Sequence, residues 1–213
     1  MPVLRSIGPG NRHATLVNTY GGVVPVTPGA LAEGLRFHYG DGASGVATLP
    51  PGTVPASNAT RSFAAWFRMI DDPDSDPASA QNKLFGYGLA SANVLTTGAE
   101  SFDLSLRYDF ATSENLIEIR GWNANALART PGPRFDLEGD WHHVAVVVPP
   151  GSPRMADLRI YLDGVRLSVT GSTALVRTAD TLFSIGAAVA NGTGANDFNG
   201  LIDEFRIYNL ALT

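Results

Sequence analysis

The chain has 213 residues, of which 44% are hydrophobic and 16% charged, a composition far from that of disordered proteins. Its formal net charge is −5 and Lys83 is its only lysine, so no basic stripe is available for a nucleic-acid backbone. No segment approaches the roughly 20 apolar residues that cross a membrane, no apolar leader follows Met1, and the absence of cysteine excludes disulfides and thiolate chemistry.

Short apolar runs separated by glycine and proline predict an all-β protein, because these two residues favour turns. In chain order, the expected strands are residues 62–69, 104–110, 116–122, 141–148, 158–162, 165–169, 181–186 and 201–208. Residues 104–110 give the clearest signal, since apolar and polar residues alternate there with the period of a half-buried strand. All-β sandwiches of roughly 200 to 250 residues form one domain, so we expect residues 1–213 to be a single domain.

Turn residues mark the connections between these runs. Asp163-Gly164 lies between two alternating segments, and this dipeptide favours a type I′ hairpin because both residues tolerate positive φ. Residues 71–77, with four aspartates, and residues 190–197 are expected to be exposed connections.

The C-terminal half carries a recognisable series of motifs. Residues 141–147 read WHHVAVV, residues 160–165 read IYLDGV, and residues 198–212 read FNGLIDEFRIYNLAL. This series resembles the laminin-G-like members of the concanavalin A-like lectin/glucanase superfamily. The N-terminal half resembles the same family more loosely, through residues 10–16, 34–37 and 62–68.

The resemblance implies a jelly-roll sandwich of two antiparallel sheets, in agreement with the number of expected strands. The family's Phe-Asp-Gly motif is altered here, where Phe37 is followed by His38, Tyr39, Gly40 and Asp41. Any role of the family's aspartate therefore moves to Asp41 or is lost. The superfamily contains lectins, carbohydrate-binding modules, adhesion domains and glycosidases, so the fold alone does not decide the function.

No arrangement typical of catalysis is found in the sequence. Glycosidases of this superfamily place two acids on one strand so that both face the sugar, and no E-x-D-x-x-E pattern is present. Asp203 and Glu204 are adjacent, so on a strand they point to opposite faces. His142 and His143 diverge for the same reason, which favours hydrogen-bonded structural histidines over a shared metal. We therefore expect no catalytic residues and no enzymatic activity.

Asp203 is the most informative polar residue for a metal site. If it is in register with Leu201, Phe205 and Ile207 on the closing strand, it faces the protein interior. A carboxylate in that position needs a partner.

Two partners are open for Asp203. The resemblance implies a structural Ca²⁺ at this edge, with Asn199 and Asp41 as further oxygen ligands. The alternative is an arginine such as Arg36, or the backbone amides of a turn.

A sugar site needs an exposed aromatic ring and a few fixed polar groups. Trp122, Asn123 and Asn125 supply them after a predicted strand, with Tyr87 and Asp109 as neighbours. The alternative for Trp122 is that it covers the core or an edge. The other two tryptophans, at positions 66 and 141, are expected in the core, because both lie inside predicted strands.

Three functions remain open. The first is a non-catalytic carbohydrate-binding or adhesive module of an exported or cell-surface protein, whose partner is a glycan or another protein. The second is a structural protein of a virion or cell surface that uses the sandwich for protein contacts, as a homo-oligomer or in a larger assembly. The third is an unusual glycoside hydrolase that depends on Glu118 or Glu204.

Overall fold

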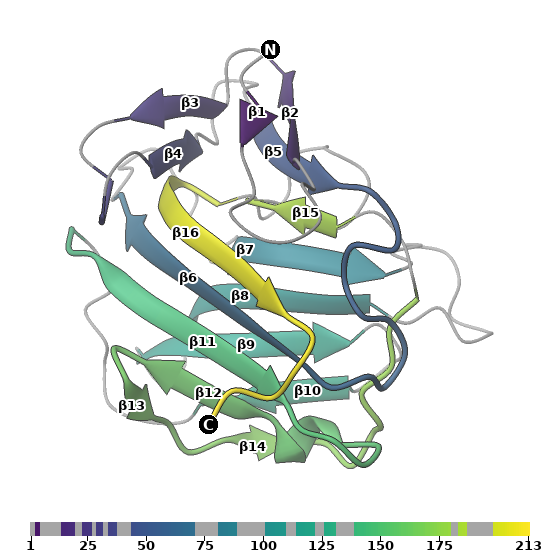
Figure 1. The fold of residues 1–213 in the computed structure, drawn as a ribbon. Helices are drawn as coiled ribbons and strands as arrows, with labels where there is room; N and C mark the ends of the chain where they lie inside the picture. Colours follow the sequence, from purple (N-terminus) through teal and green to yellow (C-terminus); the bar gives the residue numbers. More distant parts are fainter. Residues whose placement is uncertain are drawn as a thin grey trace.

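In a computed structural model of the protein, the regular secondary structure of the described residues is almost all strand. The structure describes residues 3–4, 14–19, 23–26, 29–31, 34–37, 44–70, 81–88, 101–109, 114–121, 126–130, 139–179, 183–186 and 198–213. Within these ranges the strands form two antiparallel sheets that face each other (Figure 1), and the helical element is a single 3-10 turn, Met155–Asp157. The all-β sandwich is confirmed.

The nine-stranded sheet has the order β1-β2-β5-β15-β7-β8-β9-β10-β14. Its strands are β1 (Val3–Leu4), β2 (Ala14–Thr19), β5 (Ser44–Leu49), β15 (Phe183–Ile185), β7 (Gln81–Gly88), β8 (Ser101–Asp109), β9 (Glu114–Gly121), β10 (Ala126–Arg129) and β14 (Thr170–Gly171).

The seven-stranded sheet has the order β13-β12-β11-β6-β16-β4-β3. Its strands are β13 (Val165–Arg166), β12 (Arg159–Leu162), β11 (His142–Val148), β6 (Arg61–Met69), β16 (Gly200–Tyr208), β4 (Gly34–Phe37) and β3 (Val23–Val26). Each of the eight expected strands overlaps an observed one. The expected strand 165–169 is shorter, because the chain leaves the seven-stranded sheet after Arg166 and joins the other sheet at β14.

Aromatic rings fill the centre of the core between the two sheets. Phe63 of β6 packs against four rings of the nine-stranded sheet, with ring centroids 4.6 to 5.9 Å apart, and all five rings are at most 1% exposed. These four partners are Phe85, Tyr87, Phe102 and Phe183. The cluster joins the two layers and fixes which face of each sheet points outward.

The predicted hairpin between β12 and β13 is confirmed. Asp163 and Gly164 have φ values of 50° and 78°, the left-handed conformation that a type I′ turn requires. The Asp163 carboxylate accepts a hydrogen bond from the backbone N–H of His143 at 2.7 Å, and its other oxygen lies 2.8 Å from Nδ1 of His142. The turn is thereby tied to the start of β11.

Candidate ligand-binding site

The outer face of the nine-stranded sheet carries two carboxylates on neighbouring strands. Asp103 of β8 lies 3.5 Å from Nζ of Lys83, and Glu118 of β9 accepts hydrogen bonds from Arg120 and, at 2.7 Å, from Nε of Arg129. Asp103 and Glu118 are 1% and 0% exposed. Each acid is thus bound to a cation and closed to solvent, unlike the pair that flanks a sugar in a glycosidase.

Burial also affects the proton affinity of one of these acids. Desolvation raises the pKa of Asp103 above its ordinary value, and the nearby positive charges of Lys83 and Arg120 offset only part of that effect. We interpret the group as a buried ion-pair network that orders β7, β8, β9 and β10.

The outer face of the seven-stranded sheet is different, because it presents partly exposed aromatic side chains. We call Trp66, His143, Tyr161 and Tyr208 the aromatic patch; all four are half-buried. They come from four adjacent strands, β6, β11, β12 and β16. The sequence interpretation missed this patch, although the alternation in β12, where Ile160 and Leu162 are buried, already turns the residue between them outward.

Small side chains separate the members of the aromatic patch. In register across the sheet, Tyr161 pairs with Ala145, Ala145 pairs with Ala64, and Ala64 pairs with Arg206. Three strand spacings of about 4.8 Å separate Tyr161 from Arg206 by about 14 Å. Ala145 is half-buried, whereas Ala64 is 8% exposed, and beside it Ser62 is hydrogen-bonded to the backbone of Leu210 and Leu212, so the C-terminal residues cover this end of the sheet face.

Two expectations about tryptophan are corrected by this arrangement. Trp66 is half-buried and not in the core, because Phe63, Ala65 and Phe67 take the inward positions of β6 and leave the alternate positions facing out. Trp141 is also half-buried, and it precedes the first residue of β11.

The two adjacent histidines point to different sides of β11, as predicted. The His143 ring packs on Trp66 with centroids 5.2 Å apart, whereas His142 packs on Phe67 and is bound to Asp163. The pKa of His143 is lowered by burial and, to a smaller extent, by the charge of Arg206, with Asp163 acting in the opposite direction.

Lowering the pH from 7 to 5 is expected to destabilise the protein in part through His143. The pKa of His143 in the folded protein lies below the ordinary value of 6.5. Between these two values the unfolded chain binds the proton more readily, so the free energy of unfolding falls as the pH is lowered. The variant His143→Asn does not titrate in this range and should lose less stability. Melting temperatures at pH 7, 6 and 5 test this, and identical pH dependence of both proteins would contradict it.

Asp203 is buried, at 8% exposure, but its predicted register is wrong. Asp203 pairs with Trp66 and therefore lies on the outer side, because a bulge between Asp203 and Arg206 shifts the strand. Glu204 has a φ of 49° in this bulge, after which Phe205 and Ile207 pack against the core.

The partners of Asp203 are backbone amides. Oδ2 accepts a hydrogen bond from the N–H of Leu31 at 3.1 Å and Oδ1 from the N–H of Glu204 at 2.7 Å, which agrees with the amide alternative. Each carboxylate oxygen keeps a further lone pair for a metal ligand bond. Asn199 is 7% exposed immediately before β16. Asp41 lies outside the described residues, among which no cluster of three or more metal-binding side chains occurs.

The predicted sugar site falls mainly outside the described part of the chain. Trp122, Asn123 and Asn125 lie there, as does the side chain of Asp109. Tyr87 is corrected, since it is 1% exposed in the aromatic core and is not available to a ligand at the surface. Burial raises its pKa to about 12.

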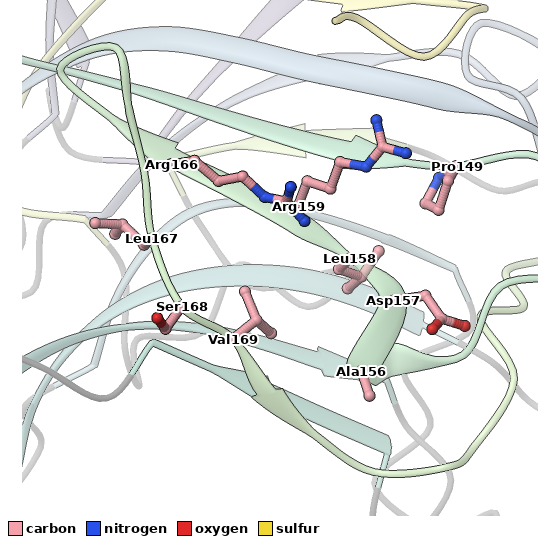
Figure 2. Close-up of a pocket in the computed structure, with 9 residues that line it drawn as sticks. All are labelled: Pro149, Ala156, Asp157, Leu158, Arg159, Arg166, Leu167, Ser168 and Val169. Carbon is pink, nitrogen blue, oxygen red and sulfur yellow. The ribbon is translucent and has the colours of Figure 1, made fainter.

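A pocket of about 570 Å³ lies at the edge of the seven-stranded sheet, beside the aromatic patch. It opens where the chain leaves β13 for the other sheet, between the start of β12 and residues 167–169 (Figure 2). Arg159, Arg166 and Ser168 contribute its polar side chains together with Asp157. Arg166 pairs with Tyr161, so the pocket adjoins the aromatic patch.

Comparison with known proteins gives one family match. A family model described as "Concanavalin A-like lectin/glucanases superfamily" matches residues 41–213. A search of curated proteins gave no significant match. No helix of the described residues is long and apolar enough to cross a membrane.

Solved structures share the fold at low sequence identity. Domain 4 of an extracellular GH43 arabinanase from Geobacillus stearothermophilus, in complex with arabinotriose, has a TM-score of 0.63 and 21% identity over 96% of this chain and 86% of that one. The binding domain of Paraclostridial Mosquitocidal Protein 1 has a TM-score of 0.63 and 14% identity over 98% and 47%. The CBM40 domain of the Ruminococcus gnavus IT-sialidase has a TM-score of 0.53 and 13% identity over 84% and 91%.

Proposed function

We propose, since the chain belongs to the concanavalin A-like lectin/glucanases superfamily, that it is a binding module without catalytic activity and that its ligand is a carbohydrate. The ligand lies on the aromatic patch of the seven-stranded sheet. The observation that carries this proposal is the placement of four half-buried rings, from four adjacent strands, on the outer face of one sheet.

The chemistry of the patch suits a sugar. A sugar ring has an apolar face that packs on an aromatic ring and hydroxyl groups that need polar partners. Trp66 and Tyr161 offer ring faces, while the hydroxyl of Tyr208 and the guanidinium of Arg206, whose side chain is 57% exposed, offer hydrogen bonds. Arg206 is held in place by Glu204, which accepts a hydrogen bond from its Nε at 3.0 Å.

The structural relatives support a binding role. One is a domain solved with arabinotriose, one is a CBM40 domain and one is the binding domain of a mosquitocidal protein. The arabinanase is extracellular, and we extend an extracellular or cell-surface location to this chain as part of the proposal. The absence of catalysis is supported by the buried, cation-bound state of Asp103 and Glu118.

Binding to a panel of neutral and acidic polysaccharides, measured by affinity electrophoresis, tests the function. We expect Tyr161→Ala and Trp66→Ala each to weaken binding about tenfold or more, because exposed aromatic residues dominate such interfaces. Val165→Ala is the matched control, since Val165 lies on the same hairpin, is 64% exposed and is outside the patch. The proposal would be contradicted if Tyr161→Ala and Trp66→Ala bound as tightly as Val165→Ala. Release of reducing sugar by the unmodified protein would also contradict it.

Calcium binding by Asp203 stays a prediction. A ligand that binds only the folded state raises the melting temperature, so comparison of melting in calcium and in chelator tests it directly.

A further inference from the structure

We infer that the pocket between Arg159 and Arg166 binds the acid group of an anionic polysaccharide, a carboxylate or a sulfate ester. This inference rests on the proposed function, because it places the acid group beside sugars held on the aromatic patch. The pocket is lined by both arginines and by Ser168.

The two arginines lie close together on one face of the β12-β13 hairpin. Arg166 pairs with Tyr161, and Arg159 is two residues before that tyrosine, so the arginines occupy diagonal positions about 7–8 Å apart. Figure 2 shows both side chains on the same side of the hairpin, with Ser168 and Val169 on the neighbouring chain segment. Like charges on one face of a hairpin repel each other, so an anion bound beside both arginines is favoured.

Neither arginine is neutralised by the part of the protein that the structure describes. Arg120 and Arg129 share Glu118, and Arg206 has Glu204, whereas Arg159 and Arg166 have no carboxylate within ion-pair distance in the described ranges. Asp157 also lines the pocket and contributes one negative charge against the two positive ones; its Oδ2 accepts a hydrogen bond from the backbone N–H of Arg154 at 2.8 Å.

The charge of the whole sheet face points to the same class of ligand. Strands β13, β12, β11, β6, β16 and β4 contain six arginines, and of these only Arg61 is fully buried. The same strands contain two acids, Asp203 and Glu204, both of which have partners. This is a basic face on a chain of net charge −5, and it is complementary to an acidic polymer.

Arginine is suited to this role by geometry as well as charge. Its planar guanidinium presents paired N–H donors that match the two oxygens of a carboxylate or of a sulfate. Ser168 adds a hydroxyl donor at the pocket. The aromatic patch then supplies contacts to the sugar rings next to the acid group, through Tyr161 in particular.

Two matched pairs of polymers test the inference. Polygalacturonate is compared with its fully methyl-esterified form, and dextran sulfate with dextran, so that only the acid group differs within each pair. We expect the unmodified protein to bind at least one acidic member at least tenfold more tightly than its neutral partner. The pair that shows the difference identifies the group as carboxylate or sulfate.

The double variant Arg159→Gln/Arg166→Gln should lose this preference and bind the acidic and neutral members alike. The control Arg36→Gln/Arg68→Gln removes the same charge from two exposed positions of the same sheet, away from the pocket, and should keep most of the preference. Circular dichroism and melting temperature check that both variants are folded.

The outcomes separate this inference from the proposed function. If the protein binds neutral and acidic members equally, and Tyr161→Ala abolishes that binding, the anion pocket is wrong and carbohydrate binding stands. If both double variants lose the preference equally, the attraction is diffuse and the pocket is again wrong. If no polysaccharide is bound, both proposals fall.

Discussion

Replacement of Phe63 by alanine is expected to lower the free energy of unfolding by about 3 to 5 kcal/mol, the range for removal of a buried aromatic ring from a packed core. Phe63 is 1% exposed, and its ring faces Phe85 at 4.6 Å and Phe102 at 5.8 Å between centroids. Its other ring partners, Tyr87 and Phe183, are in the nine-stranded sheet as well. The substitution therefore leaves a cavity where the two sheets meet.

Urea unfolding followed by tryptophan fluorescence measures this loss. Leu31→Ala is a suitable control, because the Leu31 side chain is 65% exposed and its backbone N–H, which binds Asp203, is kept. We expect the control to change stability by at most about 0.5 kcal/mol, as is usual for surface substitutions. A loss below about 1.5 kcal/mol for Phe63→Ala would mean that the rings do not pack as described.

Strand periodicity made much of the fold predictable from the sequence. The runs that became β6, β8, β11 and β16 are long, apolar on alternate positions and bounded by turn residues. Strands such as β7 were missed, because its sequence QNKLFGYG contains two glycines, which are depleted in strands, and its register is interrupted by a bulge. Tertiary pairing on both sides holds β7 in place, and no local pattern reports that pairing.

The candidate site was less predictable, for a physical reason. Periodicity indicates which residues share a face of a strand but not which of the two faces is buried. Trp66 was therefore assigned to the core, although the core is filled from this strand by the residues on either side of Trp66, Ala65 and Phe67. A bulge of one residue reversed the expected side of Asp203 and kept Phe205 inside. The two-residue turn at Asp163 implies that Tyr161 pairs with Arg166. This pairing could have predicted that a tyrosine and an arginine lie side by side at the edge of the sheet, where the basic pocket is found.

Replacement of Arg61 by methionine is expected to cost about 2 to 4 kcal/mol of stability, even though methionine keeps much of the apolar stem. Arg61 is 0% exposed, and its guanidinium donates to the carbonyl oxygens of Ser57 at 3.2 Å and Ala59 at 2.6 Å and to Oγ1 of Thr178 at 3.2 Å. It also lies 5.6 Å from the centre of the Tyr87 ring. The substitution removes all of these contacts at once.

Two opposing effects set the size of the Arg61 prediction. Hydrogen bonds to a charged donor contribute about 1.5 to 3 kcal/mol each, and the buried acceptors left behind are costly. Against this, the charge is expensive to bury, which is why desolvation lowers the pKa of Arg61. Three acceptors in two separate loops outweigh that penalty, so the net effect is a loss. Urea unfolding of Arg61→Met and Arg61→Lys tests which of the two effects is larger. Lysine keeps the positive charge but lacks the several planar N–H donors of the guanidinium, so it should recover only part of the lost stability. A methionine variant as stable as the unmodified protein would show that desolvation cancels the bonds.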